Sequence, residues 1–265
     1  MKAVFIVFSL SGHTLIAARK FMHLLEDNGI SCHMINITKN DKYLQDFTIT
    51  KTLVNDLGEH HLLIPCAPVY AGHCEQNMLR IIRALTWEKE KQIPAIPLVT
   101  YGGVHSSVAL EEMGKALNDR GYIPIMGIKI AAEYTLTATF KKQINPGLPG
   151  KVEDQILAEA AEITEKVLND KIAMVNVGKK LAYAPFLKRI MFRSFSQEKI
   201  HGKYKKVAIN TEKCIGCERC VAACPVNMFA HIDNTIQTVH DNKHCILCAE
   251  CYHHCPGVSQ FFTRR

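Results

Sequence analysis

Two stretches near the C-terminus, KCIGCERCVAACP at residues 213–225 and HCILCAECYHHCP at residues 244–256, repeat one cysteine pattern. In each stretch three cysteines stand with two residues between them, a fourth follows three residues later, and a proline comes next. Three thiolates spaced in this way can wrap three corners of a cubane 4Fe-4S cluster, so the fourth ligand must come from elsewhere in the chain. The duplicated spacing therefore predicts two such clusters and, with them, electron transfer.

Zinc and disulfide bonds are the competing interpretations of these cysteines. A structural zinc site normally takes two close pairs of ligands separated by a longer stretch, whereas each run here crowds three cysteines together and leaves one ligand too many. Disulfides require an oxidising compartment, and the apolar stretch at residues 1–8 is too short for the core of a signal peptide. Zinc stays open as the weaker alternative.

From Lys206 onward the chain resembles a bacterial-type two-cluster ferredoxin, a small α+β domain of two similar halves. Residues 206–233 and 236–262 correspond to the halves, with β-branched lead-in segments at 207–209 and 236–239. The resemblance implies that the last cysteine of each run ligates the other cluster. The two ligand sets it implies are Cys214, Cys217, Cys220 and Cys255, and Cys245, Cys248, Cys251 and Cys224. A domain of about sixty residues has a small core, so we expect the clusters to hold it folded.

The composition of the 265 residues, 48% hydrophobic and 22% charged, is ordinary for a soluble globular protein. No run of eighteen apolar residues is present, so we expect no membrane span. The net charge of +7 is unevenly placed: residues 1–170 carry 17 basic and 19 acidic side chains, residues 171–206 carry 10 and 1, and residues 207–265 carry 5 and 5. The expected location is the cytoplasm of an anaerobic or microaerobic host, because such clusters are oxygen-sensitive.

Residues 2–170 alternate apolar segments with amphipathic ones. The predicted strands are 3–8, 30–37, 62–67, 95–100 and 122–131, and the predicted helices are 13–28, 74–87, 106–118 and 152–170. The last helix shows an apolar stripe of Ile156, Ala160, Ile163 and Val167. This alternation predicts an α/β fold, a doubly wound parallel sheet of five strands. Ligands bind such sheets beyond the carboxyl ends of the strands.

The loop after the first strand, residues 9–14, places Ser9, Ser11, Gly12, His13 and Thr14 before a helix N-terminus. Hydroxyl groups and backbone N–H groups that converge at the positive end of a helix dipole form an anion site, so this loop predicts a terminal phosphate. An ordinary helix N-cap by Ser11 is the alternative.

This loop resembles the FMN-phosphate loop of flavodoxins, with His13 where an asparagine is usual. The resemblance implies a flavodoxin-like fold and an FMN whose ring lies between the loops after the third and fourth strands. These loops are Pro68, Val69, Tyr70, Ala71 and Gly72, and Thr100, Tyr101, Gly102 and Gly103. Tyr70 and Tyr101 are the candidates for stacking on the ring, and the glycines allow the backbone to approach it.

Other sequence features carry less information. No G-x-G-x-x-G motif is present, so the chain shows no dinucleotide site. Cys32 and Cys66 are expected in strands and Cys74 at the start of a helix, all as small apolar residues. The connector at residues 171–206 interleaves apolar and basic side chains around Pro185. We expect a helical strap between the domains, and the alternative is a docking surface for an acidic redox partner or an anionic membrane.

Over nearly its whole length the chain thus resembles flavodoxin–ferredoxin fusion proteins. The expected domains are a flavodoxin-like FMN-binding domain at 1–170, a basic amphipathic connector at 171–205 and a ferredoxin domain with two 4Fe-4S clusters at 206–265. The expected function is electron transfer between the clusters, FMN and redox partner proteins. The alternative is an FMN-dependent reductase of a small oxidised compound, with His73, His105, Ser106 and Ser107 near the ring as proton donors.

Overall fold

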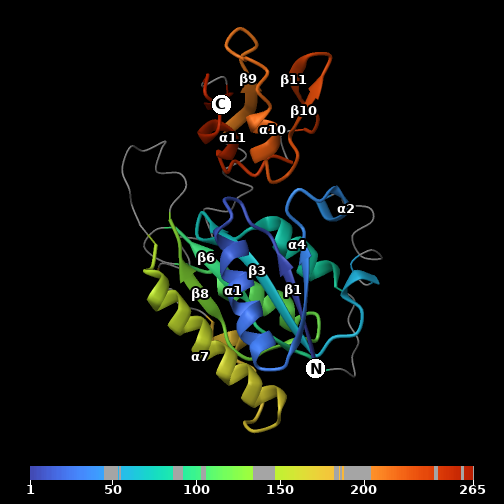
Figure 1. Ribbon diagram of the computed structural model, residues 1–265, viewed down its shortest axis with the longest axis vertical. Coiled ribbons are helices and arrows are strands. Elements are labelled where there is room, and N and C mark those ends of the chain that lie inside the picture. Colours follow the sequence, from blue (N-terminus) through green and yellow to red (C-terminus); the bar gives the residue numbers. More distant parts are fainter. Residues whose placement is uncertain are drawn as a thin grey trace.

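The computed structural model describes residues 1–44, 53, 55–85, 92–102, 106–133, 147–181, 185, 187, 204–241, 244–257 and 260–264. A larger α/β part forms the N-terminal portion, and a smaller part built from residues 204–264 lies over one end of it (Figure 1).

The N-terminal part is built on a parallel sheet. Its strands are β1 (Lys2–Val7), β2 (Ser31–Asn36), β3 (Leu62–Tyr70), β5 (Pro94–Ala95), β6 (Leu98–Tyr101), β7 (Ile123–Pro124) and β8 (Ile128–Ala131). The segments β5 and β6 together occupy the fourth position of the sheet, and β7 and β8 occupy the fifth. The strand order is therefore 2-1-3-4-5, the order of the flavodoxin-like fold, which confirms the predicted fold class.

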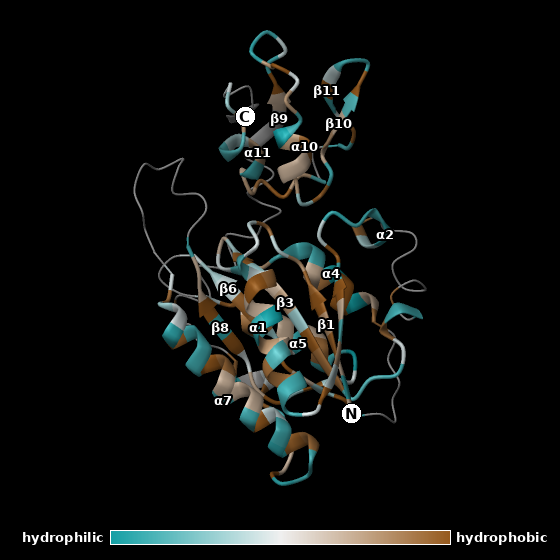
Figure 2. Cartoon of the chain, in the orientation of Figure 1, coloured by the Kyte–Doolittle hydropathy of each residue, from teal (hydrophilic) through white to brown (hydrophobic). Residues whose placement is uncertain are grey.

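Helices cover both faces of this sheet. Helices α1 (His13–Asp27) and α7 (Gly150–Leu168) pack on one face, and α4 (Gln76–Ala84) and α5 (Ala109–Asn118) pack on the other. A short helix, α2 (Asp41–Leu44), follows β2. The central strand β1 is apolar along most of its length in Figure 2, whereas α7 alternates polar and apolar surfaces. Strands buried on both faces need continuous apolar runs, and this is the pattern that the sequence shows.

The central strand β1 illustrates this requirement. Residues 3–7 are fully buried because helices cover both sides of the strand. Phe5 packs edge-on against Phe21 of α1, with ring centroids 6.0 Å apart and an interplanar angle of 76°. This arrangement suits the charge distribution of two aromatic rings and fixes α1 against the sheet.

Helix α7 buries a face that differs from the predicted stripe. Its buried residues are Leu157, Ala160, Ala161, Thr164 and Val167. Ile163, which the prediction placed in the stripe, is 43% exposed. The Thr164 hydroxyl donates to the carbonyl of Ala160 at 2.6 Å, so a polar residue is accommodated on the buried face. The prediction for Ile163 was wrong because a spacing of three or four residues fits two neighbouring stripes equally well.

The region after β3 also differs from prediction. Cys74 does not open a helix; it lies in β4 (His73–Cys74), which pairs antiparallel with the end of β3. Helix α4 begins after Glu75, whose side chain accepts hydrogen bonds from the backbone N–H groups of Asn77 and Met78. Similarly, α5 begins at Ala109 rather than at residue 106. Turns at residues 71–72 and 107–108 come before these helices, so each helix begins later in the chain than predicted.

The C-terminal part contains two short helices and two antiparallel strand pairs. Strand β9 (Tyr204–Ile209) pairs with β12 (Gln260–Arg264), and β10 (Phe229–Ile232) pairs with β11 (Thr235–Thr238). The helices are α10 (Arg219–Ala223) and α11 (Glu250–His253), which pack on each other. The predicted segments 207–209 and 236–239 fall in β9 and β11 respectively.

The start of the connector returns to the N-terminal part. A 3-10 turn, η1 (Gly178–Lys180), packs on α5, and Leu181 is 3% exposed in the core between α5 and the sheet. The Val177 N–H donates to the carbonyl of Pro124 at 2.8 Å. The predicted helical strap falls largely on residues outside the described part of the chain.

One buried carboxyl group in this fold predicts a pH dependence of stability. Glu75 is fully buried, and burial raises its pKa from 4.5 to about 7. A raised pKa means that its stabilising contribution is complete below about pH 4.5 and is lost as the pH rises through 7. We expect Glu75→Gln to gain stability relative to the native protein over this range, by up to about 3 kcal/mol at about 1.4 kcal/mol per pKa unit. The urea unfolding midpoints of the native protein and of Glu75→Gln at pH 5.5 and pH 8 measure this gain in stability. Glu59→Gln, at an exposed position, is the control. A difference that does not change with pH would refute the prediction.

Candidate functional site

Four cysteines line one small cavity in the C-terminal part. They are Cys214, Cys217 and Cys220 from the first run and Cys255 from the second. Cys217 is exposed, and its neighbour Ile215 is 72% exposed. This group, called the distal site below, is therefore open to solvent at Cys217, while Cys220 is buried.

The other four cysteines form a buried group, called the proximal site below. It consists of Cys224 from the first run and Cys245, Cys248 and Cys251 from the second. Burial raises the pKa of the Cys245 thiol to about 11, and the nearby Cys224 adds to this rise. Cys224 acts in the same direction on Cys248 and Cys251, so all four lie close together. The structure thus brings together the crossed sets that the resemblance implies, while ligation of iron stays a prediction.

The chemistry of the proximal site fits a metal cluster. Thiolates in an apolar interior are costly unless a cationic centre neutralises them, and burial raises the pKa of each of the four thiols. Among the described residues, no three His, Cys, Asp or Glu side chains are arranged to hold a single metal ion.

The backbone around both sites repeats an unusual conformation. Gly216 and Leu247 precede the second cysteine of each run with φ of 68° and 56°, and Glu218 and Ala249 follow it with φ of 58° and 63°. Left-handed residues of this kind turn successive N–H groups inward and form anion-binding concavities, a device found at iron–sulfur sites. For the three residues with side chains the conformation costs about 1–2 kcal/mol each. Such strain persists where function requires it, so the backbone fits an anionic cluster at each site.

The loop between β1 and α1 has the features of an anion site. Gly12 has φ of 90°, and an ideal Cβ there would meet nothing within 4 Å. The Ser9 hydroxyl accepts from the N–H of Leu15 at 3.3 Å. The N–H groups of residues 11–14 have no hydrogen-bond partner within the described part of the chain, and no side chain caps α1. The N-cap considered for Ser11 is thus absent from this helix, and open donors remain beside His13.

The loop after β3 is a tight hairpin. Ala71 and Gly72 have φ of 51° and 84°, which two-residue hairpin turns of this type require. Val69 pairs with Cys74, and Tyr70 pairs with His73 across the turn. The Val108 N–H donates to the carbonyl of Gly72 at 3.1 Å, so the start of α5 holds the hairpin tip in place.

The loop after β6 lies beside the other two. Thr100 pairs with Pro68 of β3, and its hydroxyl forms a 2.7 Å hydrogen bond with the hydroxyl of Thr14. Tyr101 ends β6 and is half-buried, and Gly102 follows it. The structure therefore gathers the predicted residues of all three loops at the carboxyl edge of the sheet. Gly103 lies outside the described residues.

The residues considered as proton donors have structural neighbours of their own. His73 Nδ1 lies 2.6 Å from Glu112 Oε1, and Glu112 Oε2 accepts from the N–H of Cys74 at 3.0 Å. Ser106 and Ser107 are both 2% exposed, and the Ser107 hydroxyl has no hydrogen-bond partner within the described part of the chain. His105 lies outside that part.

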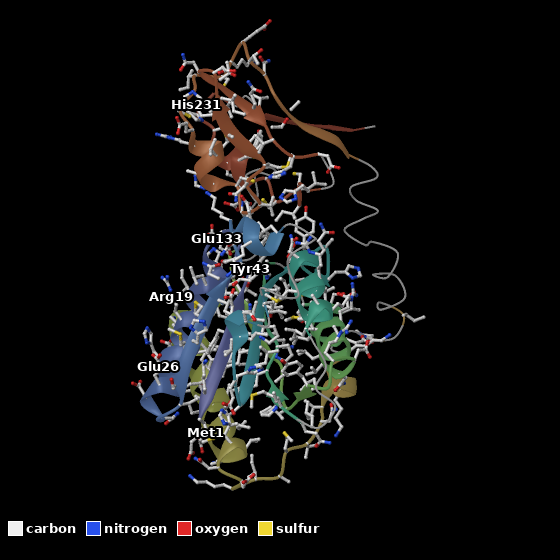
Figure 3. The ribbon with its side chains drawn as sticks, turned by 90° about the vertical axis from the view of Figure 1, so that its right-hand side faces the viewer. Met1, Arg19, Glu26, Tyr43, Glu133 and His231 are labelled. Atoms are coloured by element: carbon white, nitrogen blue, oxygen red, sulfur yellow. The ribbon has the colours of Figure 1, made fainter. Side chains whose placement is uncertain are left out.

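The proximal site lies against the carboxyl edge of the N-terminal sheet. The Tyr70 hydroxyl donates to the carbonyl of Leu247, between Cys245 and Cys248, at 2.7 Å. One hydrophobic core includes strand residues such as Val99 together with proximal-site cysteines. Figure 3 shows the C-terminal part seated at the end of the N-terminal part that carries Tyr43, away from Met1. The contact brings the proximal site, rather than the distal site, next to the three loops.

Two further contact residues were not anticipated from the sequence. The Lys39 N–H donates to the carbonyl of Pro225 at 2.8 Å, and the Asn227 side chain donates to the carbonyl of Lys39 at 3.0 Å and to Asp41 at 2.7 Å. Both Lys39 and Asn227 have left-handed backbones, with φ of 58° and 51°. These partners are nearly 190 residues apart, and no local pattern marks them. The sequence offered one signal that Lys39 could lie at this contact: it follows the second strand, and the carboxyl ends of the strands meet at the ligand-binding edge of such sheets.

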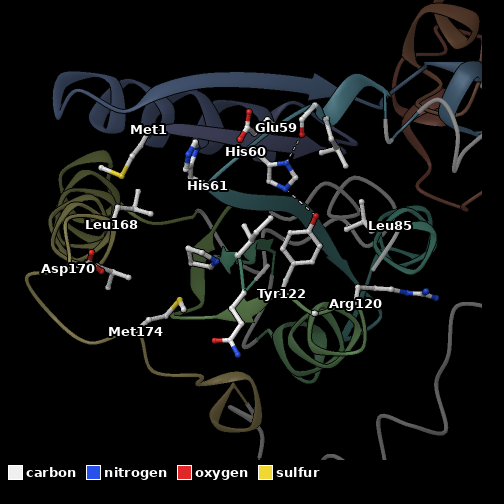
Figure 4. Close-up of a pocket in the computed structure, with 17 residues that line it drawn as sticks. Met1, Glu59, His60, His61, Leu85, Arg120, Tyr122, Leu168, Asp170 and Met174 are labelled. Carbon is white, nitrogen blue, oxygen red and sulfur yellow. Dashed lines mark hydrogen bonds between the residues drawn. The ribbon is translucent and has the colours of Figure 1, made fainter. Parts of the chain in front are cut away.

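A wide cavity of about 880 Å³ lies at the opposite end of the sheet (Figure 4). His60 stacks on Tyr122 there, and His60 Nε2 lies 3.1 Å from the Tyr122 hydroxyl. Met1 and Met174 also line it. None of the predicted site residues lies in this cavity, and ligands of such folds bind at the other edge of the sheet, so we place no cofactor in it.

Comparison with known families identifies the C-terminal part. Residues 206–256 match the family described as 4Fe-4S dicluster domain. A comparison with curated proteins gave no match. No helix among the described residues is both long enough and apolar enough to cross a membrane.

Comparison with solved structures gives matches over the N-terminal part. A rubredoxin oxygen:oxidoreductase from Desulfovibrio gigas is 13% identical with a TM-score of 0.46, and the match covers 65% of this chain but only 37% of that one. Flavodoxin 1 from Bacillus cereus is 14% identical with a TM-score of 0.43, over 65% of this chain and 100% of its own. An oxidoreductase from Corynebacterium diphtheriae is 15% identical with a TM-score of 0.46, over 65% and 98%.

The packing around the distal site predicts the effect of one added methyl group. An ideal Cβ on Gly257 would lie 2.8 Å from the carbonyl oxygen of Lys213, the residue before Cys214. Gly257→Ala must therefore push this backbone away from the cavity. We expect an iron chelator to remove about half of the iron roughly ten times faster, which corresponds to ~1.4 kcal/mol of strain. Gly150→Ala is the control, because a Cβ there meets nothing within 4 Å. Iron release at the native rate would contradict this packing.

Proposed function

We propose that this chain, in which a flavodoxin-like domain is joined to a 4Fe-4S dicluster domain, passes electrons between two 4Fe-4S clusters and a bound FMN. It exchanges them in turn with redox partner proteins. We place the domains at 1–170 and 206–265, with the connector at 171–205. The observation that carries the proposal is the contact between Tyr70 and Leu247, which joins a predicted flavin loop to the loop between Cys245 and Cys248.

The residues of the three loops fit an FMN. The open N–H groups of residues 11–14 and the hydroxyl of Thr14 would hold its phosphate at the positive end of α1. The hairpin at Ala71 and Gly72 would let the backbone approach the ring, with Tyr70 and Tyr101 beside it. The bound group would supply a centre that takes or gives electrons singly or in pairs, which iron–sulfur clusters alone do not.

The two cysteine sets have different places in this scheme. The distal set is open to solvent at Cys217 and would face a partner protein. The proximal set is buried against the N-terminal domain and would face the flavin loops. The chain itself positions both sets, excludes water from the proximal one and donates backbone N–H groups to the sulfurs of Cys224 and Cys245, at 3.2 and 3.5 Å. Hydrogen bonds to sulfur and burial are levers that set cluster potentials.

A count of cofactors tests the proposal. Protein isolated without oxygen is expected to contain about eight irons, eight sulfides and one FMN per chain. Cys255→Ser and Cys224→Ser are each expected to lower the iron content by about half, because they belong to different sets. A colourless protein, or one with zinc in place of iron, contradicts the proposal.

A reductase of small oxidised compounds is the second candidate. The pair of buried His73 and half-buried Glu112 favours it, because this pair lies at the hairpin beside the flavin loops and could move a proton. The dithionite-reduced protein is mixed without oxygen with quinones, nitroaromatics or enones, and separately with oxidised flavodoxin or ferredoxin. We expect reoxidation by the proteins alone. Catalytic consumption of a small compound, abolished in His73→Gln, would instead establish the reductase.

A further inference from the structure

We propose that Lys39 of the flavodoxin-like domain is a positioning residue for the proximal cluster and supplies the positive charge that keeps this buried cluster reducible. The inference rests on the proposed cluster content of the chain and extends it. Lys39 follows β2 at the carboxyl edge of the sheet and belongs to neither cysteine run.

The contacts of Lys39 converge on the segment that carries Cys224. Its Nζ donates to the carbonyl of Val221 at 3.1 Å and also to the carbonyl of Ala222. These carbonyls lie in the last turn of α10, where a helix presents partial negative charge and favours a cation. The Lys39 backbone is bonded separately to Pro225 and Asn227. Lys39 therefore holds both sides of Cys224 through independent groups.

The charge of Lys39 acts on the proximal site itself. The Lys39 ammonium, held at the carbonyls of Val221 and Ala222, lies beside the turn that leads into Cys224, where it favours negative charge on the sulfur ligands. Arg80 supplies a second cation nearby: its guanidinium acts on His244, next to Cys245, and is held by the carbonyls of Tyr43 and Leu44. The N-terminal domain thus adds positive charge beside the proximal site.

A reduced cluster carries one more negative charge than an oxidised one. Burial of the cluster disfavours that extra charge, and a cation held at short range favours it. Lys39 is itself exposed, but hydrogen bonds to two carbonyls hold its ammonium in place. Opposite charges at the site are Asp41, which accepts from Asn227, and the buried Glu250, whose pKa is raised by burial. The distal site has charged neighbours of its own, Lys213, Glu218 and Arg219, which belong to the C-terminal domain and stay in place when Lys39 is changed. Removal of the Lys39 charge should therefore affect one cluster and leave the other unchanged.

The test is a redox titration of the full-length protein with both clusters in place, followed by the spectroscopic signal of the reduced clusters. In Lys39→Met the backbone contacts to Pro225 and Asn227 can persist, and a side chain of similar length keeps the packing. We expect one of two reduction waves to move to more negative potential and the other to stay in place. Lys39→Arg is expected to restore the native position.

Lys42→Met is the matched control, because Lys42 lies three residues along and its ammonium pairs with Asp56 at 2.7 Å, half exposed to solvent. Neither wave is expected to move in this variant. Two unmoved waves in Lys39→Met, or equal shifts of both, would overturn the inference. If the metal content of Lys39→Met falls, Lys39→Gln and Lys39→Arg are compared instead, and equal potentials in these two overturn it. A protein with two clusters but no flavin would refute the proposed function and leave this test intact.

Discussion

The structure depends on one constraint: buried thiol groups from two separate cysteine runs share one site in the apolar interior. Cys224 of the first run lies among Cys245, Cys248 and Cys251 of the second, all of them buried. Such a group is costly as bare thiolates, and a small domain has little apolar core with which to offset that cost. Crossing the runs brings the two halves of the domain together, and under the proposed cluster content folding and cluster binding become one process.

The same constraint explains why the dicluster domain lies against the flavodoxin-like domain. The proximal site needs apolar cover and compensating charge, and the carboxyl edge of the sheet supplies both. The hydrophobic core on one face of the sheet continues into the dicluster domain, and Lys39, Asn227 and Tyr70 fix the contact through hydrogen bonds. The cysteine set that is better protected from water is thereby the one next to the predicted flavin loops. The distal site stays open to solvent, where a partner could reach it.

Much of this arrangement could be predicted from local sequence. Continuous apolar runs and helical periodicity predicted the five-stranded sheet, and the cysteine spacing predicted the dicluster domain. Local patterns failed at Ile163 on α7, where two neighbouring helix faces fit the spacing equally well. They also failed at Cys74, which lies in a hairpin strand before the helix begins. They could not indicate the contact between the domains, because Lys39 and Asn227 are far apart in the chain and each is an ordinary polar residue. The residues predicted to bind FMN and the clusters lie close together in the structure. Their binding of these groups stays a prediction.

The most direct test of the central claim is the rate at which electrons pass from the clusters to the flavin within one chain. Flash photoreduction of the clusters in the full-length protein, followed at the flavin absorbance, measures this rate over a tenfold range of protein concentration. If the proximal site serves the flavin loops of its own chain, the rate does not change with concentration. A rate that rises in proportion to concentration would show transfer between molecules and would contradict the account.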